Sequence, residues 1–193
     1  MPSGRYRSLT SNPSTRRATV FLDRDGVINA RLIDDYVTHP NEFRLLPGVV
    51  AAICRLKELG FRTVVVTNQR GIAIGRMTRA AVDAIHRNLS EWVAAAGGCL
   101  EEFYVCPHDR DEGCLCRKPQ AGLLDLAHQR EPVAWSESFL VGDSDTDILA
   151  GRRKGVCCIK LAGYSKVGAD YECSDLMGAV QFISDRIEGQ GSR

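Results

Sequence analysis

The sequence has no long apolar run, no large excess of charge and no repeated or low-complexity segment. No run approaches the roughly 20 apolar residues that a membrane-spanning helix needs, and the start, MPSGRYRSLTSNPSTRR, lacks the apolar middle of a secretory signal. Because 25 Lys and Arg residues nearly balance 24 Asp and Glu residues, the charge gives no long-range attraction for a polyanion. We expect a cytoplasmic monomer that binds neither nucleic acid nor membranes.

What the sequence does contain is enough apolar material for one globular domain. A chain of 193 residues with 44% hydrophobic residues can form a full core. Residues 1–17 are rich in Ser and Arg and show no periodicity, which is typical of a flexible arm. We expect the domain to span residues 18–188, followed by a short tail at 189–193.

Short apolar runs alternate with helical patterns along the whole domain. This alternation predicts an α/β fold of the Rossmann-like type, an open parallel sheet with helices on both faces. Gly60, Gly97 and Gly155 stand where helices should end. The expected strands are 18–23, 61–68, 103–106, 138–143 and 157–161, and the expected helices are about 49–59, 78–96, 121–129, 146–154 and 175–187.

Polar side chains follow three of the expected strands at the point where each strand ends. Asp23 and Asp25 end the first strand, Thr67 the second and Asp143 the fourth. Ligands of open parallel sheets bind beyond the carboxyl ends of the strands, so these residues should share one crevice. The three aspartates suit Mg²⁺ beside a phosphate. With that charge present, Asp23 could attack phosphorus, and Asp25 could exchange protons with the leaving oxygen and with water.

Further residues would complete a phosphate site. The Thr67 hydroxyl can donate to a phosphate oxygen, Lys118 supplies a compact positive charge, and Arg117 offers a fork for a second phosphate or a carboxylate. Asp147 could orient Lys118 or merely cap the next helix. Each group alone has an ordinary alternative, since D-x-D pairs are often turns and Arg-Lys pairs are often solvated. Their joint placement at strand ends favours phosphate chemistry.

The segment CPHDRDEGCLC supplies three thiolates and one imidazole within eleven residues. Cys106, His108, Cys114 and Cys116 form a Cys₃His set that suits tetrahedral zinc, and four protein ligands indicate a structural role. The alternative is a surface loop with free thiols. The five other cysteines are scattered, and we interpret them as small buried apolar residues.

Four motifs together resemble a known family: DRDG (23–26), TNQ (67–69), CRKP (116–119) and VGDSDTD (141–147). The chain resembles the haloacid dehalogenase phosphohydrolases, in the subgroup with a zinc loop and no large cap domain, over about residues 18–188. The resemblance implies an aspartyl phosphate on Asp23, acid/base catalysis by Asp25, Thr67 and Lys118 on the phosphoryl group, and Mg²⁺ on Asp23, the Asp25 carbonyl and Asp143. It also implies substrate contacts from Asp34, Asp35, Tyr36, Asn68, Gln69, Arg117 and Ser144.

Within this subgroup the chain is similar to the heptose bisphosphate phosphatases, through DDYV (34–37) and the following F-x-x-x-PGV run. The similarity implies a sugar phosphate substrate and removal of the C7 phosphate of D-glycero-D-manno-heptose 1,7-bisphosphate, in nucleotide-heptose synthesis. Ser144 stands where those enzymes often have lysine, and the short gap from His108 to Cys114 is closer to histidinol-phosphate phosphatases. Histidinol phosphate or another small phosphomonoester is therefore the alternative substrate, and a non-catalytic zinc-stabilised binding module is the third hypothesis.

Overall fold

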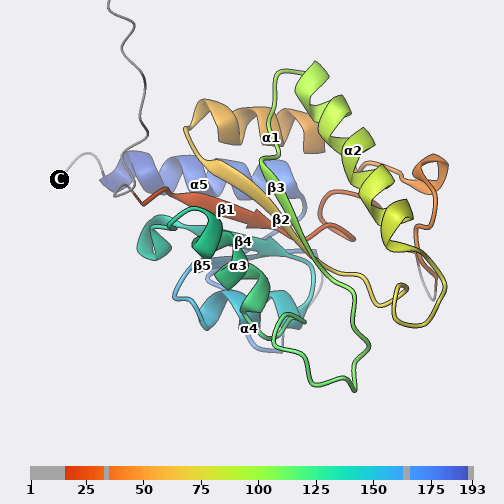
Figure 1. The fold of residues 1–193 in the computed structure, drawn as a ribbon. Coiled ribbons are helices and arrows are strands. Elements are labelled where there is room, and N and C mark those ends of the chain that lie inside the picture. Colours follow the sequence, from red (N-terminus) through yellow and green to blue (C-terminus); the bar gives the residue numbers. More distant parts are fainter. Residues whose placement is uncertain (1–15, 33–34, 163–165, 191–193) are drawn as a thin grey trace, which may run out of the picture.

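A computed structural model of the protein describes residues 16–32, 35–162 and 166–190. These residues form a six-stranded sheet in which every neighbouring pair of strands is parallel (Figure 1). The strand order is β3-β2-β1-β4-β5-β6. The strands are β1 (Thr19–Leu22), β2 (Arg62–Asn68), β3 (Glu102–Cys106), β4 (Phe139–Gly142), β5 (Cys157–Leu161) and β6 (Tyr171–Cys173).

Helices cover both faces of the sheet, as Figure 1 shows. On one face lie α1 (Val49–Glu58), α2 (Arg79–Ala95) and α5 (Leu176–Gln190), and on the other lie α3 (Gly122–Arg130) and α4 (Asp145–Arg152). Each face has its own cluster of buried apolar side chains. Successive strand residues point to opposite faces, so Leu22 packs into one cluster and Phe21 into the other. The predicted Rossmann-like sheet is therefore confirmed.

The helix limits follow local sequence signals. The Thr78 side chain accepts a hydrogen bond from the Ala81 N–H at the start of α2, which satisfies one of the free donors there. The expected glycines lie just beyond the helices: Gly60 follows α1, Gly97 follows α2 and Gly155 follows α4. Gly60 has φ 82° and Gly97 has φ 91°, a region that L side chains rarely adopt. Two one-turn helices, η1 (Pro40–Glu42) and η2 (Trp135–Glu137), lie in connecting segments.

Two expectations need correction. The sheet has a sixth strand, β6, which the sequence did not predict because it is only three residues long and mostly exposed. The scattered cysteines are not all buried: Cys158 is buried, whereas Cys54, Cys99, Cys157 and Cys173 are partly exposed.

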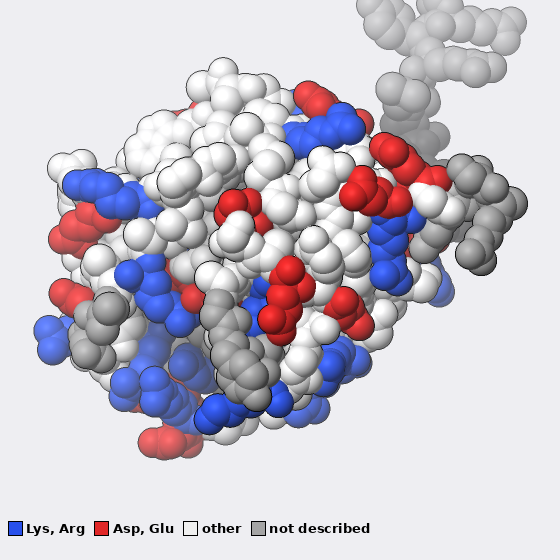
Figure 2. Space-filling model, turned by 180° about the vertical axis from the view of Figure 1, so that it is seen from behind, with Lys and Arg blue, Asp and Glu red and all other residues white. Residues whose placement is uncertain are grey.

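The start of the described chain is tied to the domain, and charged side chains of both signs lie on the surface seen in Figure 2. Most of the expected arm at 1–17 lies outside the described residues, but Arg17 pairs with Val133 in a β-bridge and forms an ion pair with Glu101 at 2.9 Å. Within the described part of the chain, no helix is long and apolar enough to cross a bilayer. Figure 2 shows acidic and basic side chains mixed over one face, with Lys and Arg denser toward its lower edge.

The strand order shows where a ligand site is expected in this sheet. β1 lies between β2 and β4, so the chain order reverses between β1 and β4. In doubly wound folds the ligand crevice lies at this switch point, beyond the carboxyl ends of the strands. Asp23 directly follows β1 and Asp143 directly follows β4.

Candidate active site

A cavity of about 630 Å³ opens at this end of the sheet. Its size falls within the range of about 300–1,000 Å³ that is usual for small-molecule sites. The structure thus brings together predicted site residues from four separate segments. The cavity is lined in part by Asp23, Asp25, Thr67, Asn68, Arg117, Lys118 and Ser144.

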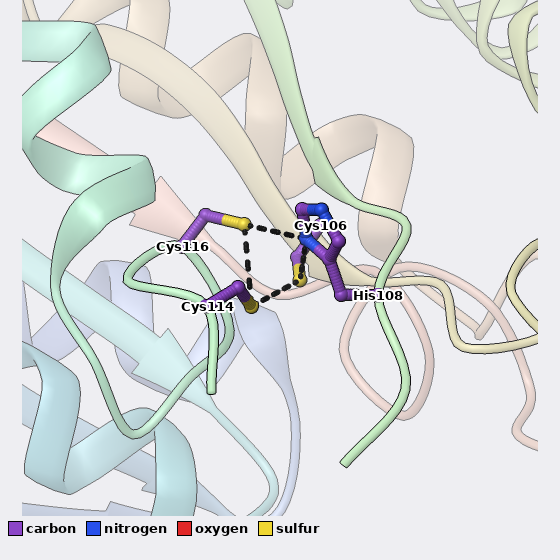
Figure 3. A group of neighbouring side chains, drawn as sticks. All are labelled: Cys106, His108, Cys114 and Cys116. Carbon is purple, nitrogen blue, oxygen red and sulfur yellow. Dashed lines mark hydrogen bonds between the residues drawn. The ribbon is translucent and has the colours of Figure 1, made fainter. Parts of the chain in front are cut away.

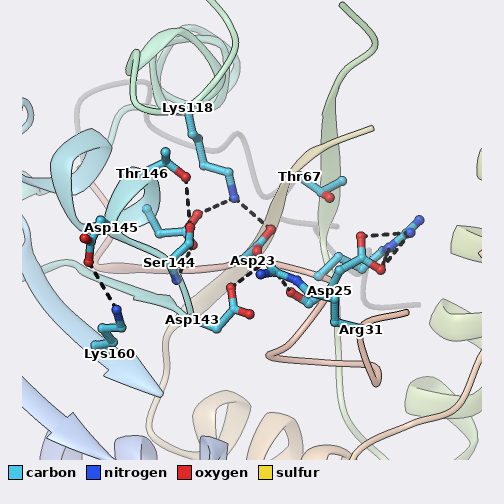
Figure 4. Close-up of polar contacts among 12 residues, drawn as sticks. Asp23, Asp25, Arg31, Thr67, Lys118, Asp143, Ser144, Asp145, Thr146 and Lys160 are labelled. Atoms are coloured by element: carbon cyan, nitrogen blue, oxygen red, sulfur yellow. Dashed lines mark hydrogen bonds and ion pairs between the residues drawn. The ribbon is translucent and has the colours of Figure 1, made fainter. Parts of the chain in front are cut away.

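Lys118 occupies the floor of this cavity with two carboxylates. Its ammonium lies 2.7 Å from Asp23 Oδ1 and 2.6 Å from Asp147 Oδ1, and it donates to the Val66 carbonyl at 2.8 Å (Figure 4). All three charged side chains are buried. Burial and the nearby Asp147 raise the pKa of Asp23 to about 7, although Lys118 acts in the opposite direction. The ammonium therefore offsets much of the charge repulsion between the two carboxylates.

Asp147 has both of the roles that the sequence left open. It forms the ion pair with Lys118, and its Oδ2 accepts from the Ser144 N–H at 3.1 Å and from the Ser144 hydroxyl at 2.5 Å, which caps α4. Close packing requires glycine beside it, because a Cβ at Gly142 would lie 2.2 Å from the Asp147 Cβ. The start of α4 is thereby fixed against the end of β4.

Asp25 is held by donors from two segments, the turn after β1 and the residue that follows β2. Arg24 Nη2 donates to both of its carboxylate oxygens at 3.0 Å, Asn29 Nδ2 donates to Oδ1 at 2.9 Å, and Gln69 Nε2 donates to Oδ2 at 2.8 Å. Although burial acts to raise the pKa of Asp25, the Arg24 charge and these hydrogen bonds hold it below its ordinary value. Asp25 is therefore a fixed carboxylate that lines the cavity.

A second layer holds Arg24 in place. Arg24 is 1% exposed, and its Nη1 lies 3.4 Å from Nε2 of His86, a residue of α2. The His86 ring stacks on Phe103 with a centroid distance of 4.4 Å. Burial, and then the Arg24 charge, lower the pKa of His86 to about 3, so the imidazole is neutral and its ring nitrogen can accept from Arg24.

Three carboxylates have the chemistry of a divalent-cation site. Oxygens of Asp23, Asp143 and Asp147 lie within 4.8 Å of one another. Both oxygens of Asp147 are engaged with Lys118 and Ser144, which leaves Asp23 and Asp143 as available ligands. Carboxylate and carbonyl oxygens are the donors that Mg²⁺ prefers. The residues present therefore fit Mg²⁺.

The guanidinium of Arg31 lies against two of the oxygens that could bind a cation. Its Nη2 lies 2.9 Å from Asp143 Oδ1 and 3.4 Å from the Asp25 carbonyl oxygen. Backbone and carboxylate approach so closely here that a Cβ at Gly26, whose φ is 94°, would lie 2.0 Å from Asp143 Oδ2. Glycine after Asp25 is therefore a requirement of this geometry.

The four predicted zinc ligands form one cluster (Figure 3). The Cys106 sulfur lies 3.6 Å from His108 Nδ1 and 3.7 Å from the Cys114 sulfur, and the Cys116 sulfur lies 3.2 Å from His108 Nδ1 and 3.6 Å from the Cys114 sulfur. Tetrahedral zinc with bonds of about 2.1–2.3 Å would place its ligand atoms about 3.4–3.8 Å apart. Three of the four distances fall in this range, and the His108–Cys116 distance of 3.2 Å is slightly shorter. The donor set and its spacing therefore fit zinc.

The remaining predicted residues lie around the rim or support the floor. The Asn68 side chain makes hydrogen bonds of 3.1 Å to both the N–H and the carbonyl of Lys118, and Gln69 Nε2 also reaches the Thr67 hydroxyl at 2.8 Å. Arg117 donates to the His108 carbonyl at 3.2 Å. Asp35 and Tyr36 line an adjoining cavity of about 390 Å³, and Asp34 lies outside the described residues.

Comparison with known proteins identifies the family. A family model described as "Polynucleotide kinase 3 phosphatase" matches residues 19–183. The chain belongs to this phosphatase family. A curated relative from Mycobacterium bovis, D-glycero-alpha-D-manno-heptose-1,7-bisphosphate 7-phosphatase, is 42% identical over 130 residues, 67% of this chain and 68% of the relative. The corresponding beta-D-manno enzyme of Pseudomonas aeruginosa is 42% identical over 136 residues, 70% of this chain and 76% of the relative.

A solved structure agrees with these relatives. D,D-heptose 1,7-bisphosphate phosphatase from B. bronchiseptica, complexed with magnesium and phosphate, matches with a TM-score of 0.80 and 31% identity, covering 88% of this chain and 99% of the other. The predicted fold of the haloacid dehalogenase type is confirmed. The prediction of a phosphatase is confirmed as well.

Several residues of this phosphatase site were missed from sequence. Arg24 lies between two aspartates and looks like a solvated charge, yet it is buried and paired. Asn29 and Arg31 follow in the same turn, and His86 comes from a helix 62 residues away. A signal existed only for Asn29, because an Asn four residues after an aspartate in a glycine turn is well placed to donate to it.

Proposed function

We propose that the protein is a Mg²⁺-dependent phosphatase that removes the C7 phosphate of D-glycero-D-manno-heptose 1,7-bisphosphate. The observation that carries this proposal is the pair of carboxylates after β1, Asp23 against Lys118 and Asp25 within its set of donors, facing one cavity. The heptose substrate is supported by the relatives at 42% identity. We assign the activity to one domain, residues 18–188.

In the first step Asp23 acts as the nucleophile. A bond forms between a carboxylate oxygen of Asp23 and phosphorus, and the bond between phosphorus and the C7 oxygen breaks. Asp23, Asp143 and the Asp25 carbonyl would hold Mg²⁺, which when bound offsets the repulsion between Asp23 and the phosphate. Lys118, in contact with Asp23, contributes positive charge, and the Thr67 hydroxyl would donate to a phosphate oxygen.

Asp25 moves the protons in both steps. The incoming phosphate raises the pKa of Asp25 by adding negative charge, so that Asp25 can take up a proton and pass it to the leaving C7 oxygen. In the second step the Asp25 carboxylate takes a proton from water, the water oxygen bonds to phosphorus, and the bond from phosphorus to Asp23 breaks. Arg24, Asn29 and Gln69 hold Asp25 in position for both transfers.

The surrounding segments position these groups and contact the sugar. Asn68 holds the backbone of Lys118 by two hydrogen bonds, and the zinc ligands end one residue before Arg117, so bound zinc would fix the segment that carries both cations. We propose that Arg117 and Ser144 face the substrate across the cavity, and that Asp35, Tyr36 and Gln69 contribute the adjoining wall. The substrate contact predicted for Asp34 concerns a residue outside the described part of the chain.

A comparison of substrates tests the proposal. Phosphate release with Mg²⁺ is measured for heptose 1,7-bisphosphate as both C1 anomers, for histidinol phosphate, for a hexose bisphosphate and for an oligonucleotide with a 3′-phosphate. We expect the highest kcat/KM with one of the heptose anomers. A higher kcat/KM for histidinol phosphate or for the oligonucleotide would overturn the assignment.

A further inference from the structure

Two adjoining cavities at the active site are together lined by six cationic and five carboxylate side chains. The larger one, about 630 Å³, contains the reacting carboxylates, and the smaller one, about 390 Å³, contains Asp35 and Tyr36. Both cavities are lined by Arg31 and Arg110, so these two side chains stand where the cavities meet. The cations lining one or both cavities are Arg24, Arg31, Arg70, Arg110, Arg117 and Lys118.

Protein groups already engage five of these six cations. Arg24 binds Asp25 at 3.0 Å, Arg31 binds Asp143 at 2.9 Å and Arg70 binds Asp109 at 2.5 Å. Arg117 donates to the His108 carbonyl at 3.2 Å, and Lys118 bridges two buried carboxylates. Each of these contacts explains why the side chain lies where it does.

Arg110 differs from the other five. Within the described residues, its guanidinium makes no hydrogen bond or ion pair, and the residue is exposed. Its backbone, in contrast, is anchored: its N–H donates to Asp109 Oδ1 at 2.5 Å, and the Asp109 N–H donates to Glu112 Oε1 at 2.6 Å. The ion pair of Asp109 with Arg70 ties the same loop to the segment after β2. The Arg110 guanidinium is therefore available to a ligand, while its backbone is held in place.

The proposed substrate has a second phosphate that needs such a partner. Its reacting phosphate lies against Asp23 and Lys118, and its other phosphate stays attached to the sugar. The Ser144 hydroxyl is not free for that phosphate, because it already contacts Asp147 Oδ2 at 2.5 Å and the Thr146 hydroxyl at 2.8 Å. A guanidinium matches phosphate oxygens with two parallel hydrogen bonds.

We propose that Arg110 binds the phosphate that is not hydrolysed and thereby selects bisphosphates over monophosphates. This inference rests on the proposed function and deepens it. It makes Arg110 a specificity-determining residue contributed by the zinc loop, and it gives the loop a direct contact with substrate in addition to its positioning of Lys118.

The test compares Arg110→Ala, Arg110→Lys and the wild-type protein on heptose 1,7-bisphosphate and heptose 7-phosphate. Loss of a hydrogen-bonded charge should lower kcat/KM for the bisphosphate about tenfold to a hundredfold. The value for the monophosphate should stay within about twofold, and the lysine variant should lie between. Inhibition by the product heptose 1-phosphate, which keeps the second phosphate, should weaken by a similar factor. Arg87→Ala, an exposed arginine of α2 outside both cavities, is the matched control, and zinc content is measured for each variant.

The outcomes separate this inference from the proposed function. Equal loss on both substrates, or no loss on either, overturns the role of Arg110. Wild-type protein that hydrolyses both heptose phosphates equally well has no second-phosphate site, which overturns this inference but leaves the 7-phosphatase intact. If a hexose bisphosphate is preferred and Arg110→Ala removes that preference, the inference stands and the heptose assignment fails.

Discussion

Replacing Lys118 by methionine should be the most informative single change for stability. Methionine fills a similar volume without the charge, so the buried carboxylates of Asp23 and Asp147 face each other without the ammonium that lies 2.7 and 2.6 Å from them. Breaking a buried ion pair by removing one partner costs about 3–5 kcal/mol. We expect a loss of that size in the free energy of unfolding at pH 9, in buffer without magnesium.

The loss should depend on pH with a defined sign. The pKa of Asp23, about 7 with Lys118 present, rises further in the variant because the opposing charge is gone. The folded variant then binds a proton at a pH where the unfolded chain does not. Between the raised pKa of Asp23 in the folded variant and its pKa in the unfolded chain, each unit of decrease in pH stabilises the folded state by about 1.4 kcal/mol. The deficit relative to wild type should therefore shrink as the pH falls from 9 to 7.

Urea denaturation at pH 9, 8 and 7 measures both effects. Lys57→Met is the control, since Lys57 is exposed and donates to the Gly97 carbonyl, and it should stay within about 1 kcal/mol of wild type. A Lys118→Met deficit below about 1 kcal/mol at pH 9, or a deficit that grows toward pH 7, would refute the reasoning.

Three further changes test other parts of the site. The pKa of His86 is lowered to about 3 in the folded protein, so its contribution to folding stability is complete above pH 6.5 and is lost as the pH falls. The loss should be about 2 kcal/mol between pH 6.5 and 5. In urea titrations, the unfolding free energy of His86→Gln should therefore fall less steeply with decreasing pH than that of the wild type. Cys116→Ser should lower bound zinc and reduce kcat/KM more than tenfold, measured by metal analysis and phosphate release. Gly26→Ala should displace Asp143 and weaken Mg²⁺ binding at least tenfold in calorimetric titrations.

Matched controls make these results specific. Cys157→Ser changes a partly buried thiol outside the cluster and should keep zinc. Gly75→Ala imposes a similar backbone strain, φ 69°, with open space at the Cβ, and should keep Mg²⁺ affinity. Equal pH slopes for wild type and His86→Gln, or equal metal loss in a variant and its control, would contradict the corresponding prediction.

The sequence predicted the sheet and the position of the site because both depend on short-range patterns. Apolar runs such as TVFL and RTVVV end at Asp23 and Thr67, and parallel strands must bring such ends to one edge. β6 escaped prediction because its three residues are largely exposed and carry no apolar run. Local patterns therefore identify strands that carry an apolar run, including the edge strand β3, better than a short exposed strand such as β6.

The electrostatic arrangement could not be predicted in the same way. Nothing in DRDG indicates that Arg24 turns inward, since its burial depends on His86 from α2. The sequence left Asp147 as either a helix cap or a partner of Lys118, and the structure shows both, because its two oxygens point to different neighbours. Such roles depend on contacts between distant segments, which spacing along the chain does not encode.

The central claim, that Asp23 is the attacking group beside a Mg²⁺ site formed by separate strand ends, is tested most directly by phosphate release from heptose 1,7-bisphosphate. The wild-type protein should release phosphate with Mg²⁺ and lose this activity when Mg²⁺ is withheld, and Asp23→Asn should be inactive under both conditions while retaining its zinc and its cooperative unfolding. Release by Asp23→Asn at a rate close to wild type would contradict the account.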